Sequence, residues 1–242
     1  MVSQPLDIPL PPTQDDLPCD DGVPMATQRH KLQLDLLLET LQPWLAQRHD
    51  GYAGGNMFLY YSMAQVRNQD YMGPDVFVVV DVPKKERKSW VVWEEEKGPD
   101  VVIELLSAST ARYDKMGKKR LYEQQVRVPE YFWFDPFNPE DWAGFRLVGG
   151  RYEPLGVNDA GFLPSESLGL SLGRWSGQYQ GVEAVWLRWA TPSGVWLPTK
   201  DDLLTQERRR AEQERQRAQQ EHQRAEHLAE RLRAMGVDPD EL

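Results

Sequence analysis

The sequence predicts an α/β fold of the α+β kind, in which helices flank a central mixed sheet, followed by a long C-terminal helix. Between residues 25 and 136 the chain alternates helix-like and strand-like segments, an order typical of a sheet covered by helices. Residues 201–235 contain neither glycine nor proline, as expected of a long helix. The 242 residues are enough to bury a core without disulfides, and the single cysteine, Cys19, excludes an intramolecular bridge.

Composition divides the chain into three parts. Residues 1–24 are rich in proline and aspartate and show little periodicity, so we expect a flexible N-terminal lead-in. Residues 25–200 carry the predicted folded domain. Residues 201–242 form a charged helical tail.

The first predicted element is a helix over residues 26–48, where leucines recur at helical spacing. Thr27 is a suitable N-cap, and Pro43 is expected to kink the helix or end its regular part. The glycines within residues 51–55 should then break the chain before an aromatic strand at residues 57–61.

Two runs of β-branched residues, 76–82 and 101–106, predict strands buried on both faces. The charged segment between them, residues 84–97, fits either a loop or an additional edge strand. A helix is predicted over residues 112–125 because capping residues precede it, and an aromatic strand follows at residues 130–135.

The last part of the domain carries hairpin signals. Gly149 and Gly150 separate two strand-like runs, residues 145–148 and 151–155. The Gly-, Pro- and Trp-rich stretch that follows predicts short strands and turns packed on the main sheet.

The C-terminal helix, predicted over residues 201–235, has an apolar residue at every seventh position. These positions are Leu204, Ala211, Ala218, Ala225 and Leu232. The companion positions three residues later are mostly glutamate, so an oligomerising coiled coil and a solvated single helix both fit the pattern. A homo-oligomer through residues 201–235 is one of these two interpretations.

Charge and motif content exclude several classes of protein. The formal net charge is −10, from 28 Lys and Arg against 38 Asp and Glu, which argues against a general polyanion-coating protein. The sequence has no P-loop, no dinucleotide fingerprint and no histidine cluster for a metal. The first 25 residues do not resemble a signal peptide, and no apolar run is long enough for a membrane span. We therefore expect a cytoplasmic protein without membrane contact.

The remaining candidates for chemistry are acids beside the buried strands. Pro-Asp dipeptides containing Asp75 and Asp100 open the two strands, and Glu104 interrupts the apolar run of the second strand. A buried Glu104 needs either a structural ion pair or a cation shared with another carboxylate. If Asp75 lies on a neighbouring strand, two carboxylates about 4 Å apart repel by about 4 kcal/mol at an effective dielectric of about 20, so a proton or a cation should lie between them. Oxygen ligands of this kind suit Mg²⁺ or Mn²⁺.

A row of polar residues on the following helix supplies a positive charge. Asp114, Lys118 and Tyr122 are spaced i, i+4, i+8 along one side, and Gly117 would let the helix approach the sheet closely. Lys118 can then point toward Glu104. The alternative is a solvated helix face on which Asp114 and Lys118 form an ordinary surface pair.

These residues together resemble the Uma-two family, bacterial restriction-endonuclease-like domains of the PD-(D/E)XK nuclease superfamily. The resemblance covers about residues 25–190. It is carried by Pro74-Asp75-Val76, the run from Pro99 to Ser107 with Ser109-Thr110, then Asp114, Lys118 and Tyr122, and finally Val128-Pro129-Glu130-Tyr131 with Trp133 and Asp135-Pro136.

The resemblance implies a restriction-endonuclease-like core and a Mg²⁺-dependent (or Mn²⁺-dependent) endonuclease acting on DNA. By this resemblance Asp75 and Glu104 would bind the metal. The superfamily's usual lysine slot, two residues after the second acid, holds Leu106 here, and Lys118 is the matching helical substitute. Lys118 would orient the attacking water and stabilise charge on the phosphate.

Three further residues are secondary candidates for the site: Asp100, Glu39 and Tyr122. A local basic patch is also expected from Lys84, Lys85, Arg87 and Lys88 together with residues 115–120. The alternative function is a non-catalytic nucleic-acid or protein-interaction module that retains the nuclease fold and oligomerises through its C-terminal helix.

Overall fold

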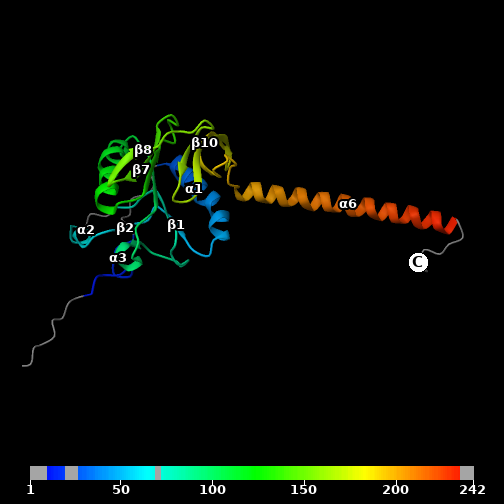
Figure 1. The fold of residues 1–242 in the computed structure, drawn as a ribbon, viewed down its shortest axis with the longest axis horizontal. Helices are drawn as coiled ribbons and strands as arrows, with labels where there is room; N and C mark the ends of the chain where they lie inside the picture. The colour runs from blue at the N-terminus through cyan, green and yellow to red at the C-terminus, as the bar shows by residue number, and fades with distance from the viewer. Residues whose placement is uncertain (1–9, 20–26, 69–71, 235–242) are drawn as a thin grey trace, which may run out of the picture. The chain divides into compact units, whose positions relative to one another are not determined.

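The computed structural model describes residues 10–19, 27–68 and 72–234. The chain divides into two compact units, with the boundary in the sequence between Leu197 and Pro198. The first unit contains every strand, and the second contains the long helix (Figure 1).

A six-stranded mixed sheet forms the centre of the first unit, in the order β1-β3-β5-β6-β7-β8. Its strands are β1 (Tyr52–Gly55), β3 (Val76–Val79), β5 (Val101–Leu105), β6 (Glu130–Phe134), β7 (Trp142–Val148) and β8 (Arg151–Pro154). β5 and β6 run parallel, and the other neighbouring pairs are antiparallel. The predicted α+β class with a central mixed sheet is confirmed, as is the β7–β8 hairpin, in which Gly149 and Gly150 both adopt positive φ.

Helix α1 (Gln28–Gln47) covers one face of this sheet. The Thr27 side chain caps it by accepting a hydrogen bond from the backbone N–H of His30. The helix continues to Gln47 and does not end at Pro43. Packing of Leu45 in the core and a hydrogen bond from Lys84 Nζ to the Leu45 carbonyl hold this last turn.

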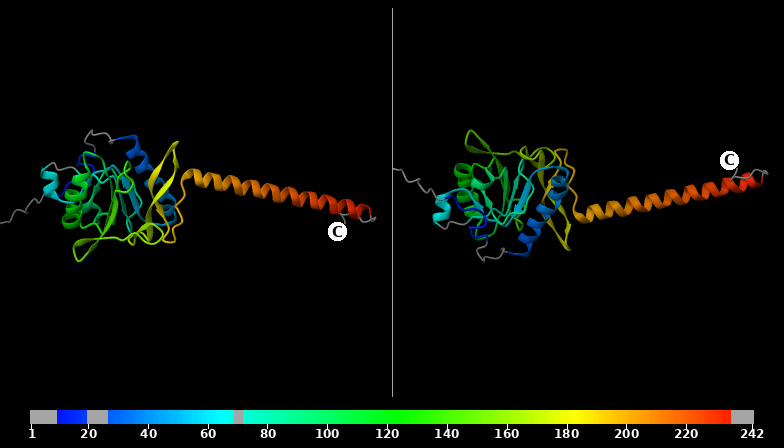
Figure 2. Two further views of the ribbon diagram at one scale, coloured as in Figure 1. Left: turned by 90° about the horizontal axis from the view of Figure 1, so that it is seen from above. Right: turned by 90° about the horizontal axis from the view of Figure 1, so that it is seen from below.

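A second sheet lies on the other side of α1, as Figure 2 shows. It consists of β9 (Phe162–Ser165), β10 (Leu170–Tyr179) and β11 (Val182–Ala190). β10 and β11 are longer than the short strands that the sequence predicted, and they pack against α1. The Gln33 side chain joins them to α1, since it bonds both the N–H and the carbonyl of Leu187.

The opposite face of the central sheet is covered by one helical segment from Ala111 to Val126. It comprises α4 (Ala111–Tyr113), the π-helix η1 (Asp114–Lys118), α5 (Lys119–Leu121) and the π-helix η2 (Tyr122–Val126). The predicted helix over residues 112–125 is therefore present, with two π-helical turns that periodicity did not indicate.

The region of the expected glycine break contains a strand, and the elements after it are short. β1 contains Gly54, where a Cβ atom would lie 2.6 Å from the Phe77 ring, so glycine lets this ring pack on the strand. The predicted strand at residues 57–61 shortens to β2 (Leu59–Tyr60). β2 pairs in parallel with β4 (Trp90–Val91) from the charged segment, which also contains α3 (Val92–Glu95). A short helix not predicted from the sequence, α2 (Met63–Asn68), follows β2.

Part of the expected flexible lead-in packs on the domain. Leu17 is buried with Phe58 and Val91, and the indole N–H of Trp93 donates to the Pro12 carbonyl at 2.8 Å. Residues 10–19 thus lie along α3 and β4. The rest of the lead-in, residues 1–9 and 20–24, falls outside the described residues.

The second unit contains α6 (Lys200–Ala234), in agreement with the predicted C-terminal helix. Its start is held by a reciprocal capping pair: Thr199 Oγ1 accepts from the Asp202 N–H, and Asp202 Oδ2 accepts from the Thr199 N–H. Leu203, Leu204 and Leu228 are exposed. Oligomerisation through this helix stays a prediction. No helix among the described residues is long and apolar enough to cross a membrane.

Candidate active site

A fully buried carboxylate, Glu104, lies at the centre of the candidate site. β5 directs it toward the face covered by the helical segment 111–126, because Glu104 alternates with Ile103 and Leu105, which point into the α1 core. Glu104 Oε1 accepts a hydrogen bond from the Tyr122 hydroxyl at 2.8 Å, and Oε2 accepts one from Lys118 Nζ at 2.8 Å. Both oxygens of this acid are therefore held by one helix.

The row Asp114, Lys118 and Tyr122 faces the sheet and is not a solvated surface. Asp114 is 1% exposed and Tyr122 is fully buried. Lys118 Nζ also lies 3.2 Å from Asp114 Oδ1, so one ammonium group bridges two buried carboxylates. The Tyr131 hydroxyl donates to the Asp114 carbonyl at 2.9 Å and ties this π-helical turn to β6.

Asp75 completes the group from the neighbouring strand. It directly precedes β3, and its Oδ2 accepts a hydrogen bond from the Leu105 N–H at 2.7 Å. Antiparallel pairing of β3 with β5 brings it beside Glu104, close enough for the two carboxyl groups to share a hydrogen bond. The structure thus brings together Asp75, Glu104, Lys118 and Tyr122.

Burial is the largest single influence on the pKa values of Glu104, Asp75 and Lys118. It raises the pKa of Glu104 to about 8, against the opposing effect of the Lys118 ammonium group. Burial also raises the pKa of Asp75, again opposed by Lys118. For Lys118 burial acts to lower the pKa, but the carboxylates of Glu104, Asp114 and Asp75 together raise it. Lys118 is therefore charged at neutral pH, while Glu104 retains a proton until the pH rises or another cation approaches.

The donor set is suited to a hard divalent cation. Within the described residues, no three or more His, Cys, Asp or Glu side chains are grouped to hold a metal ion by themselves. Mg²⁺ is usually bound by only one or two carboxylates, with water and substrate phosphate filling the other positions. Asp75 and Glu104 meet that requirement, and the buried Oδ1 of Asp114 lies nearby, paired with the Lys118 ammonium group at 3.2 Å. Once Glu104 is ionised, three carboxylates against one lysine leave negative charge for a cation to balance.

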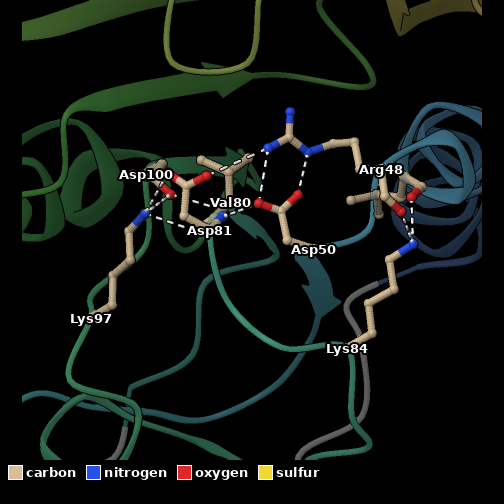
Figure 3. Close-up of polar contacts among 8 residues, drawn as sticks. Arg48, Asp50, Val80, Asp81, Lys84, Lys97 and Asp100 are labelled. Atoms are coloured by element: carbon tan, nitrogen blue, oxygen red, sulfur yellow. Dashed lines mark hydrogen bonds and ion pairs between the residues drawn. The ribbon is translucent and has the colours of Figure 1, made fainter.

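The structure does not bring Asp100 to this group. Asp100 Oδ2 accepts a hydrogen bond from the Val80 N–H at 2.8 Å and pairs with Lys97 at 3.1 Å, as Figure 3 shows. It precedes Glu104 by four residues, about 13 Å along an extended strand. Asp100 therefore fastens the start of β5 to the end of β3, even though it has the same strand phase as Glu104.

Glu39 lies away from the site as well. It is on α1, which covers the sheet face opposite to the one Glu104 points to. Its Oε2 accepts a hydrogen bond from the Tyr179 hydroxyl of β10 at 3.0 Å. Glu39 therefore links α1 to the second sheet.

The expected basic patch is largely neutralised by partners within the protein. Lys84 donates to the carbonyls of Leu45 and Arg48 at the end of α1 (Figure 3). The other cations of this segment pair as follows: Lys85 and Arg87 with Glu95, and Lys88 with Asp15. In the second part of the patch Lys115 pairs with Asp141 and Lys118 with Glu104. Lys119 lies over the Phe145 ring, and Arg120 is exposed. Most cations of the expected patch are therefore held by groups of the protein itself.

Asp114 belongs to the buried site, although the sequence pattern alone did not distinguish this position from a surface ion pair. Its i, i+4 spacing from Lys118 was the available signal, and that spacing is equally typical of a surface pair. Only the burial of the helix face distinguishes the two.

The chain is similar to known proteins across most of this domain. A family model, Uma2, described as "Putative restriction endonuclease", matches residues 17–178. The uncharacterized protein slr1290 of Synechocystis sp. is 29% identical over 106 residues, which are 44% of this chain and 53% of that protein. This chain thus spans about half the length of that curated relative. A solved structure, described as a putative nuclease belonging to DUF820 from Anabaena variabilis, is 16% identical with a TM-score of 0.45, and the match covers 65% of this chain and 91% of that chain.

Proposed function

The chain belongs to the Uma2 family, whose model is described as "Putative restriction endonuclease", and from this premise we propose that it is a metal-dependent endonuclease that hydrolyses phosphodiester bonds in DNA. The observation that carries the proposal is the buried Glu104 carboxylate, which lies beside Asp75 and is bonded to Lys118 at 2.8 Å. A purely structural ion pair would need one acid for one base, whereas three acids surround this lysine.

Asp75 and Glu104 are the residues that would hold Mg²⁺ or Mn²⁺. When bound, such an ion polarises the phosphate and makes a hydroxide ion available near neutral pH. Binding requires Glu104 to lose its proton, since a carboxylate is the ligand form. The Tyr122 hydroxyl keeps the Glu104 carboxylate in one orientation, because it donates to Oε1 from a fully buried position.

Lys118 is the residue that acts on the substrate. Its ammonium group is charged at neutral pH and can orient a water molecule and stabilise negative charge on the phosphate. Asp114 positions this ammonium group from the preceding helical turn, at 3.2 Å. Lys118, on the covering helical segment, thus takes the place of a lysine two residues after Glu104, where this chain has the buried Leu106.

A plasmid-nicking assay tests the proposal. Supercoiled DNA is incubated with the protein and Mg²⁺ or Mn²⁺, and the variants Asp75→Asn, Glu104→Gln and Lys118→Met should lose nicking. Asp81→Asn is the matched control, because Asp81 is an exposed acid at φ 55°, a conformation that asparagine tolerates.

The outcome separates the enzyme from the second candidate function. If the wild type nicks DNA only with a divalent metal and the control does the same, the endonuclease is supported. If the wild type and Glu104→Gln nick equally, the proposed site does not cleave DNA and the proposal fails. If neither nicks with any divalent metal, the proposal also fails and the chain is instead a non-catalytic nucleic-acid or protein-interaction module. The neutralised cations of residues 84–88 favour that second candidate. In either case we propose that residues 25–200 act as the functional domain and 201–242 as its helical tail.

A further inference from the structure

Tyr113 is an exposed aromatic residue next to the candidate site. Its residue surface is 54% exposed, and it directly precedes Asp114. Its ring lies against Gly117: a Cβ atom at position 117 would be 2.4 and 2.5 Å from two ring carbons. Any other residue at position 117 would displace the Tyr113 ring. Glycine therefore lets one side of the ring pack on the helix, while the rest of the ring is exposed to solvent.

Gly117 lowers the stability of the helical segment, and packing of the core does not explain why a glycine is present there. Glycine is a poor helix former, and Gly117 lies within the π-helical turn Asp114–Lys118. π-helical turns are uncommon and occur frequently at functional sites. Because the Tyr113 ring is largely exposed, the glycine provides a fixed position for a surface ring and no additional core.

Three neighbouring rows run along this helical segment. The middle row contains Asp114 and Lys118 and faces Glu104 on β5. The row on one flank contains Lys115 and Lys119, whose ammonium groups lie 5.7 and 5.8 Å from the centre of the Trp133 ring on β6. The row on the other flank contains Tyr113 and Gly117.

The order of strands places the Tyr113 row on the side of Asp75. β5 lies between β3 and β6 in the central sheet. Since the lysine flank covers β6, the tyrosine flank is directed toward β3, the strand that Asp75 precedes. The exposed ring therefore lies on the flank of the helical segment that is directed toward Asp75, whose carboxyl group is half-buried.

The charges near the site disfavour a duplex held mainly by its phosphates. Binding of duplex DNA depends on many contacts between basic residues and phosphates. On the helical segment beside the site, Lys115 pairs with Asp141, Lys118 pairs with Glu104, and the Lys119 ammonium group lies 3.3 Å from the centre of the Phe145 ring. Arg112 and Arg120 are the exposed cations of this segment. Unpaired bases can instead be bound by stacking on aromatic rings, which requires fewer free cations.

We propose that Tyr113 is a stacking platform for an unpaired nucleobase, and that the substrate of this site is single-stranded DNA or a single-stranded segment within a duplex. The inference rests on the proposed nuclease function and specifies its substrate class. The base next to the reacting phosphate stacks on the open face of Tyr113, while the phosphate lies by Lys118 and Asp75.

The test measures DNA binding without cleavage. Fluorescence anisotropy in EDTA compares a labelled single-stranded oligodeoxynucleotide with a duplex of the same sequence. The variants are Tyr113→Ala, Tyr113→Phe, which keeps the ring, and Met116→Ala, a control residue on the same helical segment that is 65% exposed. Both positions are at the surface, so the three variants should fold normally.

We expect the single strand to bind more tightly than the duplex and Tyr113→Ala to weaken single-strand binding by about tenfold or more. Tyr113→Phe and Met116→Ala should bind like the wild type. Equal binding by the wild type and Tyr113→Ala, tighter binding of the duplex, or equal loss in the phenylalanine and alanine variants would each overturn the inference. The binding assay needs no metal, so it is independent of cleavage. Tyr113-dependent binding without nicking would support the stacking platform and refute only the endonuclease. Nicking without Tyr113-dependent binding would refute only the stacking platform.

Discussion

Replacing Glu104 by glutamine should change how the stability of the metal-free protein depends on pH. An unfolded glutamate ionises near pH 4.5, whereas burial raises the pKa of Glu104 in the folded protein to about 8. Below pH 4.5 the side chain is protonated in both states and its favourable contribution is complete. As the pH rises toward 8, only the unfolded chain releases the proton, so the contribution is progressively lost.

The magnitude follows from the size of the shift. Each pKa unit corresponds to about 1.4 kcal/mol, so the wild type should lose up to about 5 kcal/mol of unfolding free energy from this residue between about pH 4.5 and 8. Glutamine does not titrate. The difference in unfolding free energy between Glu104→Gln and the wild type should therefore increase with pH in the direction that favours the variant.

Urea unfolding in EDTA at several pH values between 4.5 and 9 measures this difference, with Glu86→Gln, the same substitution at an exposed position, as the matched control. A constant difference between Glu104→Gln and the wild type over that range would refute the reasoning, since it would mean that Glu104 ionises normally. Under the proposed function, Mg²⁺ at pH 8 should stabilise the wild type, because the ionised carboxylate binds it, and should have little effect on Glu104→Gln.

Two further predictions concern packing and hydrogen bonding. Gly54→Ala should destabilise the protein by about 1–3 kcal/mol, because the added Cβ meets the buried Phe77 ring at 2.6 Å, whereas Gly156→Ala, which meets nothing within 4 Å, should be nearly neutral in the same thermal unfolding assay. Equal shifts in melting temperature for the two variants would show that β1 does not pack as described. Tyr122→Phe should cost about 1–3 kcal/mol in urea unfolding, because Glu104 loses its buried hydrogen-bond donor, and the cost should be larger at pH 9 than at pH 7, since more of Glu104 is ionised at pH 9. An unchanged midpoint at pH 9 would mean that this hydrogen bond is absent.

The sequence by itself determined the features that depend on local periodicity. The leucine spacing of α1, the apolar run of β5 and the Gly149-Gly150 turn each specify an element whose hydrogen bonds are made within a few residues or with the adjacent strand. The i, i+4, i+8 spacing likewise placed Lys118 and Tyr122 on one helix face. These predictions hold because side-chain direction repeats with the backbone period.

Local patterns were less informative where an element depends on a distant partner. Gly54 reads as a break, yet it lies within β1 because the Phe77 ring fills the space a side chain would take. The proline-rich lead-in reads as flexible, yet Leu17 is buried against residues far along the chain. In both cases the stabilising contact comes from another part of the sequence.

Only the tertiary structure decided which charged groups meet. Asp100 has the same strand phase as Glu104, but strand phase fixes the side of the sheet and not the position along it, and Asp100 pairs with Lys97 at the far end of β5. Glu39 was placed on the opposite face by the packing of α1. The lysine that meets Glu104 does so because the helix crosses β5 at that point and both groups are removed from water, where an unpaired charge would be too costly to bury.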